Sequence, residues 1–198
     1  MPFNYNEITI KNAWLLGFVF ADGTIGKHQG IDVIKIYNKD ENLLENIRYV
    51  YKIPYVVTPQ TNYENLVYFI RISDPDFVTS VQQLGYRKDK EGLRIPLMDE
   101  ECMKMFLRGF LRGKGSDFYE KTGLKGYNIN FRSQTLINDV SRNLSIHSGV
   151  KEKEAIRQQG KNLITYSLKY RNGERQKIKE FLIQIPGAEF RDFSRFWK

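Results

Sequence analysis

The sequence predicts an α/β (α+β) fold in which one αββαββα unit is used twice. In the 198-residue chain, residues 15–23 return in altered form and without a gap as residues 107–115. The two copies are separated by 109 − 17 = 92 positions, close to half of the chain. Each copy is followed by the same alternation of β-branched runs and helical apolar patterns. Internal repetition at this spacing predicts two pseudo-symmetric repeats, 1–98 and 99–198, joined in one compact unit.

Each copy of the repeated segment is typical of a helix that packs closely against its twin. Gly17 and Ala21 are four residues apart, as are Gly109 and Gly113, so small residues share one face of each helix. Small residues let two helix backbones approach closely. We therefore expect the two helices to lie side by side, in parallel, at the centre of the molecule.

Parallel packing would bring positions 22 and 114 together at one end of the helix pair. Gly23 and Gly115 follow them, where a helix is expected to end in a left-handed residue. Asp22 is unexpected at a helix C-terminus because its carboxylate faces the negative end of the macrodipole, whereas the ammonium of Lys114 is favoured there. A broken local rule often marks a functional site. An Asp22–Lys114 ion pair is the expected arrangement.

The remaining elements follow from apolar periodicity and capping residues. In the first repeat we expect a strand at 31–38, a helix capped by Asp40, strands at 55–61 and 66–73, and a helix from Pro75 to about 84. In the second repeat we expect a helix at 103–113, a hairpin of 116–121 and 127–132, a helix at 136–144, a hairpin of 151–158 and 163–171, and a helix at 174–185.

Polar and apolar residues alternate along the expected strands of the second repeat. Tyr127, Ile129 and Phe131 alternate with Asn128, Asn130 and Arg132, which predicts one face packed on helices and one face in water. Polar sets recur on the other two strands, namely Lys151, Lys153, Arg157 and Gln159, and Thr165, Ser167, Lys169 and Arg171. Amide and guanidinium groups on such a ribbon suit base edges in the major groove of DNA. The strand faces of the first repeat are less polar, with Lys35 and Arg71 among apolar residues. They could contact thymine methyl groups or be less involved.

The charge is unevenly distributed along the chain. The net charge is +8, and residues 1–98 carry 11 basic against 11 acidic residues, whereas residues 99–198 carry 20 against 12. An excess of this kind favours a nucleic acid as the partner. The alternative for each polar strand alone is a solvated surface without a partner.

Composition excludes several other classes. Apolar content of 41% and charged content of 27% indicate a soluble globular chain, and no run approaches the roughly 20 apolar residues of a membrane span. The N-terminus lacks a secretion signal pattern. A single cysteine, Cys102, excludes an internal disulfide, and two separate histidines lack zinc-site spacing. We expect a monomer in a reducing compartment, either the cytoplasm or a nucleoid or organelle matrix, without a membrane partner.

The repeated segments LLGFVFADG and LRGFLRGKG resemble the two motifs of single-chain LAGLIDADG homing endonucleases. The resemblance implies that the motif helices join two halves whose antiparallel sheets form a saddle over double-stranded DNA. It also implies that the penultimate acid of each motif binds Mg²⁺ and activates the water that cuts a strand. Asp22 matches that acid and Lys114 replaces it in the second motif. Asn38 and Lys39 match the polar and basic pair beside the metal, and Arg132, with Ser133 or Gln134, takes their place in the second repeat.

We expect a protein that binds a long DNA site, with phosphodiester hydrolysis impaired or limited to nicking by Lys114. The alternatives are an inactive sequence-specific DNA-binding protein and an intron RNA splicing cofactor (maturase), as some members of the family are. The expected catalytic set is Asp22, Asn38 and Lys39, with Lys114 in place of an acid, and Asp22 is the expected metal ligand. The expected DNA contacts are Lys35, Arg71, Asn128, Asn130, Arg132, Lys151, Lys153, Arg157, Thr165, Ser167, Lys169 and Arg171.

Overall fold

Two copies of one αββαββα unit make up the structure, a computed structural model that describes residues 8–62, 65–119, 123, 125–160, 163–171 and 173–184. The first copy contains, in order, α1 (Ile10–Asp22), β1 (Gly23–His28), β2 (Ile31–Asn38), α2 (Glu41–Val50), β3 (Thr58–Asn62), β4 (Asn65–Ile72) and α3 (Pro75–Gln83). The second contains α4 (Glu100–Lys114), β5 (Gly115–Tyr119), β6 (Lys125–Phe131), α5 (Gln134–Ser148), β7 (Ile156–Gln159), β8 (Ile164–Arg171) and α6 (Gly173–Ile183). The predicted order and fold class are confirmed.

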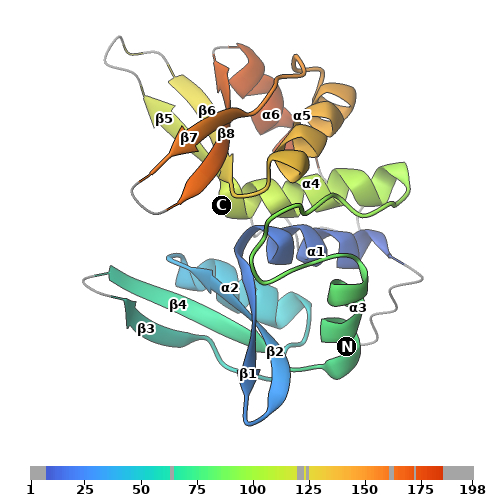
Figure 1. Ribbon diagram of the computed structural model, residues 1–198, viewed down its shortest axis with the longest axis vertical. Coiled ribbons are helices and arrows are strands. Elements are labelled where there is room, and N and C mark those ends of the chain that lie inside the picture. The colour runs from blue at the N-terminus through green and yellow to red at the C-terminus, as the bar shows by residue number, and fades with distance from the viewer. Residues whose placement is uncertain are drawn as a thin grey trace.

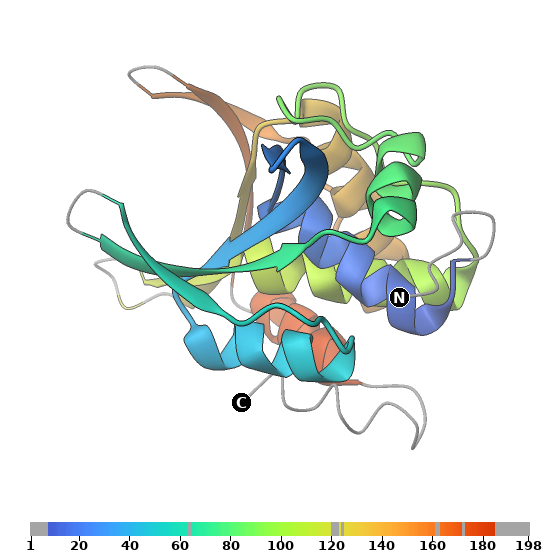
Figure 2. The same cartoon turned by 90° about the horizontal axis from the view of Figure 1, so that it is seen from below.

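Each repeat contributes one antiparallel sheet, with strand order β1-β2-β4-β3 in the first and β5-β6-β8-β7 in the second. The helices α1 and α4 lie side by side at the middle of the molecule, with one sheet on each side of the pair (Figure 1). In the perpendicular view the β3–β4 and β7–β8 hairpins project on the side away from α1 and α4 (Figure 2). Each sheet therefore has a face packed on helices and an opposite face, called here the outward face.

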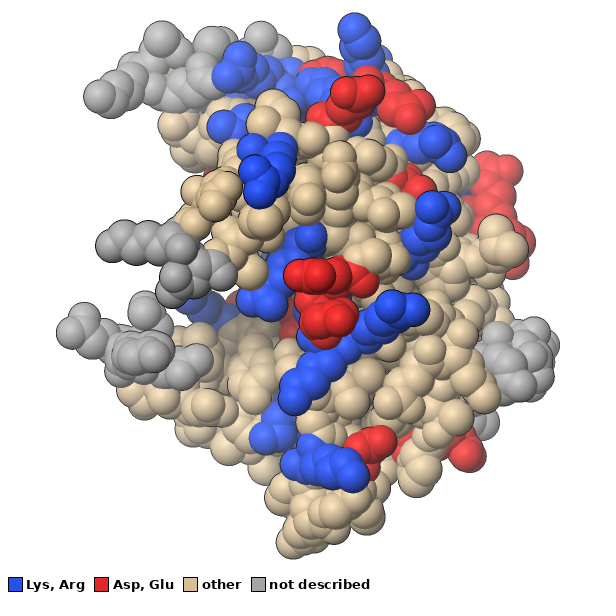
Figure 3. Space-filling model, in the orientation of Figure 1, with Lys and Arg blue, Asp and Glu red and all other residues tan. Residues whose placement is uncertain are grey.

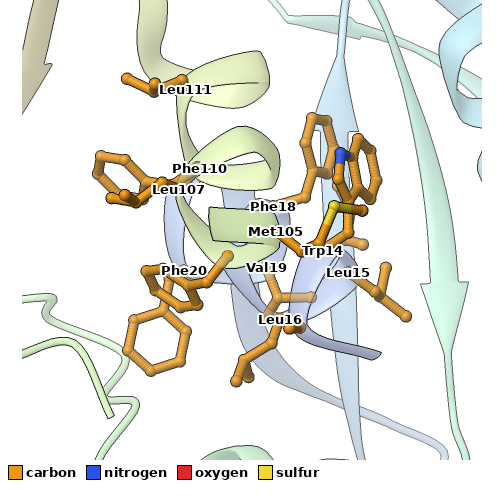
Figure 4. Close-up of a cluster of buried hydrophobic side chains, with 14 of the residues drawn as sticks. Trp14, Leu15, Leu16, Phe18, Val19, Phe20, Met105, Leu107, Phe110 and Leu111 are labelled. Carbon is orange, nitrogen blue, oxygen red and sulfur yellow. The ribbon is translucent and has the colours of Figure 1, made fainter. Parts of the chain in front are cut away.

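The helix pair is held by close backbone packing and by a large apolar cluster. A Cβ atom at Gly17 would overlap the backbone carbonyl of Phe106, and one at Gly109 would overlap that of Trp14. The predicted role of the small residues is confirmed. Around this contact, side chains of α1 and α4 interlock (Figure 4), and Phe20 meets Phe106 edge to face at 5.4 Å. Complete burial of each such side chain contributes about 1.5–3 kcal/mol, so the seam between the repeats is the core of the molecule.

The prediction that Gly23 and Gly115 adopt left-handed caps is wrong. Both are extended, with φ −67° and ψ 155° at Gly23 and φ −85° and ψ 142° at Gly115, because each motif helix runs directly into a strand. Glycine is required there for space. A Cβ at Gly115 would overlap the hydroxyl of Tyr127, and one at Gly23 would lie 2.5 Å from the carbonyl oxygen of Val19.

Two of the predicted strands are shorter than expected. Residues 55–57 precede β3, and residues 151–155 precede β7 without forming a strand. The backbone donors of the second segment bond to helix side chains instead of a neighbouring strand. Lys153 N donates to Ser141 Oγ at 2.7 Å and Ala155 N to Asn138 Oδ1 at 3.1 Å. The predicted helix at 174–185 ends at Ile183, and the turns at 63–64, 120–122 and 161–162 fall outside the described residues.

None of the helices within the described ranges is long and apolar enough to cross a bilayer.

Candidate functional site

The C-terminal ends of α1 and α4 bring Asp22 and Lys114 into direct contact. Lys114 Nζ lies 2.5 Å from Asp22 Oδ1, with side-chain exposures of 30% and 12% respectively. The close approach of the helices produces this contact, because a Cβ on Gly113 would lie only 2.6 Å from Ala21 Cβ. The expected ion pair is therefore confirmed.

Lys90, in the connection after α3, is a second ammonium at this place that sequence reasoning missed. Its Nζ donates to the carbonyl oxygen of Ala21 at 2.8 Å and lies 5.6 Å from the ring centre of Phe131. The pKa of Lys90 is lowered to about 7, mainly by burial and also by the charges of Lys114 and Arg132, while Asp22 opposes the shift. A basic run at 87–90 was the available signal, but its return to the end of α1 depends on tertiary folding.

Burial raises the pKa of Asp22 above its ordinary value, and the charges of Lys114 and Lys90 with a hydrogen bond from Asn38 offset part of that rise. The structure therefore brings Asn38 to Asp22, as the resemblance implied. Asn38 Oδ1 also accepts from Asp40 N at 2.9 Å, which ties this side chain to the start of α2. Lys39 is exposed beside it.

The donor set fits one divalent cation at most. No cluster of three His, Cys, Asp or Glu residues occurs within the described ranges, and Asp22 shares its carboxylate with Lys114. Asp117 does not provide a second acid, because Arg175 Nε and Nη2 bond its two oxygens at 3.0 and 3.1 Å and Lys179 Nζ lies 3.0 Å away. Mg²⁺ is commonly held by one or two carboxylates together with substrate phosphates. The arrangement supplies one carboxylate, the ammonium of Lys114 bonded to it, and the amine of Lys90 nearby.

Two arginines of α4 are bonded inside the protein, and one of them contacts the other repeat. Arg112 Nη2 lies 3.1 Å from Asp40 Oδ2 of the first repeat. Arg108 is only 4% exposed, and its Nε donates to the carbonyl oxygen of Phe181 at 3.0 Å. Arg112 therefore pairs with a carboxylate across the seam, and Arg108 is bonded inside the second repeat.

The outward face of the second sheet is polar, as predicted. Strand register places Asn128 opposite Lys169 and Asn130 opposite Ser167, while the alternate positions Tyr127, Ile129, Phe131, Leu168 and Tyr170 are buried against the helices. Asn130, Lys169, Arg171 and, just past β6, Arg132 are exposed, and Asn128 and Thr165 are half-buried. Most of the predicted polar set therefore shares one accessible surface.

Four members of that set are placed differently. Ser167 is fully buried although it lies opposite the exposed Asn130. Arg157 lies opposite Tyr166 and is therefore on the helix side of the sheet. A shift of one residue in strand register moves a side chain to the other face. Lys151 and Lys153 precede β7, and Lys153 Nζ forms a 2.5 Å ion pair with Glu174.

The outward face of the first sheet carries rings and cations together. Lys35 lies opposite Arg71, and Tyr37 lies opposite Phe69. Arg71 Cζ stands 4.2 Å above the ring of Tyr55, and Lys35 Nζ stands 5.1 Å above the ring of Phe69. Figure 3 shows Lys and Arg side chains over both halves of the molecule, with acidic side chains near the middle of the view. A hollow of about 620 Å³ also lies beside Arg132, between the start of α5 and the β7–β8 hairpin.

No protein-family model matches the sequence, and no curated protein matches it. Solved structures do match. The chain is similar to the homing endonuclease I-WcaI bound to its DNA recognition sequence, with a TM-score of 0.58 and 14% identity over 92% of this chain and 86% of that one. It is similar to a mesophilic variant of the homing endonuclease I-DmoI, with a TM-score of 0.57 and 18% identity over 88% and 90% of the two chains.

A third similar structure is the I-LtrWI LAGLIDADG homing endonuclease bound to target DNA, with a TM-score of 0.52 and 15% identity over 96% and 89% of the two chains. Other I-DmoI structures contain DNA with Ca or with Mn. The chain therefore has the fold of single-chain LAGLIDADG homing endonucleases, and the predicted resemblance is confirmed at the level of the fold.

Proposed function

We propose that this protein binds a long, asymmetric double-stranded DNA site across the outward faces of its two sheets, and that its phosphodiester hydrolysis is limited to nicking. The observation that carries the proposal is the Asp22–Lys114 ion pair at the ends of the central helices. It leaves one carboxylate, not two, at the point midway between the sheets. The fold shared with DNA-bound homing endonucleases supports the choice of partner.

The second sheet supplies the polar recognition surface. Asn128 and Asn130 have the amide groups that pair with adenine, and Arg132 and Arg171 have the guanidinium groups that pair with guanine. Lys169 is suited to phosphate, which positions the duplex without reading its sequence. The excess of 20 basic over 12 acidic residues in 99–198 favours this half as the stronger anchor.

Asp22 is the residue that would hold a divalent cation, with the amide of Asn38 next to it. Such an ion, when bound, polarises a phosphate and lowers the pKa of an attacking water. In the free protein Lys114 forms an ion pair with the carboxylate of Asp22, and Lys90 adds positive charge close by. A phosphate at the seam would draw these ammonium groups away from Asp22, which links ion binding to DNA binding. A second ion has no acid to hold it from α4.

The second candidate is a sequence-specific DNA-binding protein without hydrolytic activity. It is favoured by the same ion pair, because Lys114 neutralises the carboxylate of Asp22 and Lys90 lies close by. The intron RNA cofactor is a third hypothesis, and competition by folded intron RNA against the DNA site separates it from both.

Cleavage of supercoiled plasmid that carries a selected target site tests the proposal. With Mg²⁺, the unaltered chain should convert supercoiled plasmid to nicked circles, and Asp22→Asn should abolish nicking while DNA binding persists. Lys114→Asp or Lys114→Glu should produce linear plasmid, with a gain in double-strand cleavage of about 10²-fold or more because a second acid is restored.

Lys114→Met is the matched control, because it removes the ammonium without adding an acid, and it should not linearise the plasmid. Efficient linearisation by the unaltered chain would contradict the proposal. Specific binding without any nicking would establish the inactive DNA-binding protein instead.

A further inference from the structure

The two sheets have the same topology but opposite chemistry at three equivalent outward positions of their central strands. Asp40 caps α2 directly after β2, and Ser133 caps α5 directly after β6. Counting back three residues from each cap makes Tyr37 of the first sheet equivalent to Asn130 of the second. Strand register then extends the equivalence. Phe69 opposite Tyr37 corresponds to Ser167 opposite Asn130.

The same register makes Val67 equivalent to Thr165, since each lies opposite a glutamine of the edge strand, Gln60 or Gln158. Three successive outward positions are thus polar in the second sheet and apolar in the first. Arg71 and Lys169 are equivalent cations in the two sheets. On the edge strands the contrast is reversed at one position, where Thr58 lies opposite Phe69 and Ile156 lies opposite Ser167.

Core packing does not account for these three apolar side chains. The helix side of β2 and β4 is already filled by isoleucines that are 0–2% exposed, namely Ile34, Ile36, Ile70 and Ile72. Val67, Tyr37 and Phe69 lie on the opposite side and remain half-buried. A surface that offers apolar groups between cations suits a partner that is anionic but carries apolar groups of its own.

Ring geometry distinguishes between two ways of contacting bases. The rings of Tyr37 and Phe69 are 5.6 Å apart and tilted by 41°, and Lys35 Nζ covers the face of Phe69 at 5.1 Å. Stacking of unpaired bases needs open ring faces. Ring edges and the Val67 side chain suit contact with a methyl group instead, and thymine is the one DNA base with a methyl group in the major groove.

We infer that the first sheet recognises its half of the duplex through thymine methyl groups, contacted by Val67, Tyr37 and Phe69. The inference rests on the proposed function and adds which bases one half of the site contains. Lys35 and Arg71 flank the apolar strip and neutralise phosphates beside it. The second sheet reads purines through amide and guanidinium groups, so the two halves of the target differ in composition.

Selection from a randomised duplex library, with the full chain, identifies the target and its two halves. Selection is then repeated with the double variant Tyr37→Asn/Phe69→Ser, which gives the first sheet the residues of the second. In this variant the base preference should change in one half of the target only, and that half is the one bound by the first sheet. Asn130→Ala is the matched variant, and it should change preference in the other half. Circular dichroism and thermal unfolding show that each variant is folded.

Replacing thymine by deoxyuridine then removes only the methyl group. In the half under the first sheet, each contacted position should lose about fourfold in affinity, and the double variant should lose this sensitivity. Substitution in the other half should change affinity less than twofold. Equal effects of deoxyuridine in both halves of the target, or no effect in the half under the first sheet, would overturn the inference. The proposed function would still stand in that case, because the chain would still bind the duplex. Failure to select any duplex, or tighter binding to single-stranded oligonucleotides, would overturn both.

Discussion

At the scale of single residues, Lys114 has the largest consequence for the chemistry of the site. Its ammonium lies 2.5 Å from Asp22, the carboxylate that the motif provides at the seam. Lys90 reaches the same place from the end of the first repeat through the carbonyl of Ala21. The site is therefore electropositive when free, which suits a phosphate better than a cation. Under the proposed function we therefore expect DNA to bind before an ion does.

Cys102 is expected to be unreactive in the folded protein. The pKa of its thiol is raised to about 12, mainly by burial and also by the nearby carboxylates of Asp99 and Glu101. The Sγ atom donates to the carbonyl oxygen of Ile8 at 3.0 Å. At pH 8 its thiolate fraction should be lower than that of a free cysteine by about three orders of magnitude. Reaction with a disulfide reagent should be correspondingly slow and become rapid in denaturant. Immediate labelling of the native protein would contradict this expectation, and Cys102→Ser provides the blank.

At the scale of elements, the α1–α4 pair depends on two glycines. Gly17→Ala and Gly109→Ala each place a methyl group against a backbone carbonyl of the other helix. Backbone atoms relax less than flexible side chains, so each substitution should cost about 3 kcal/mol of unfolding free energy. Urea unfolding measures the cost. Gly26→Ala is the matched control, because a Cβ there meets nothing within 4 Å. Equal stability of Gly17→Ala and Gly26→Ala would refute the close packing.

Helix α6 is fastened to β5 by Asp117, and this contact should depend on pH. Burial alone would raise the pKa of Asp117, but hydrogen bonds and charges from Arg175 and Lys179 outweigh it and lower the pKa. A lowered folded pKa stabilises the protein above the unfolded pKa, and the stabilisation is lost as pH falls through the folded value. Asp117→Asn should therefore cost about 1 kcal/mol at pH 7.

The stability difference between Asp117→Asn and the unaltered chain should shrink in acid, below a pH of about 4. Chemical unfolding at a series of pH values measures it. Asp32→Asn, at an exposed position on β2, is the control. A constant difference from pH 7 to pH 2 would show that the charge of Asp117 is not the cause.

At the scale of the whole molecule, the two halves should contribute unequally to DNA affinity. Arg132 and Arg171 are exposed, whereas Arg71 is stacked on Tyr55 and Lys35 lies over Phe69. Replacing Arg132 or Arg171 by alanine should weaken DNA binding about tenfold in each case and make the binding less dependent on salt. Replacing Arg71 or Lys35 should have a smaller effect. Binding measured across a series of salt concentrations checks this, and a larger loss from the first-repeat pair would contradict it.

Much of the architecture followed from local patterns. The repeat, the helix cap Asp40 and the order of elements were predictable because capping and apolar periodicity act over a few residues. Strand limits were less accurate at residues 151–155, since side chains of α5 and α6 take the backbone donors there. Those acceptors are brought close only when the helices fold against the segment.

By itself the sequence determined that two similar halves meet through glycine-containing helices and that Asp22 faces a lysine. The tertiary structure decided what surrounds that pair. Lys90 bonds the carbonyl oxygen of Ala21 at the end of α1, 69 residues earlier in the chain, and Asp117 forms an ion pair with Arg175 of α6. It also decided that Gly23 and Gly115 are extended, because the helices lead straight into strands. Such contacts join residues far apart in the chain, and no local pattern of the sequence specifies them.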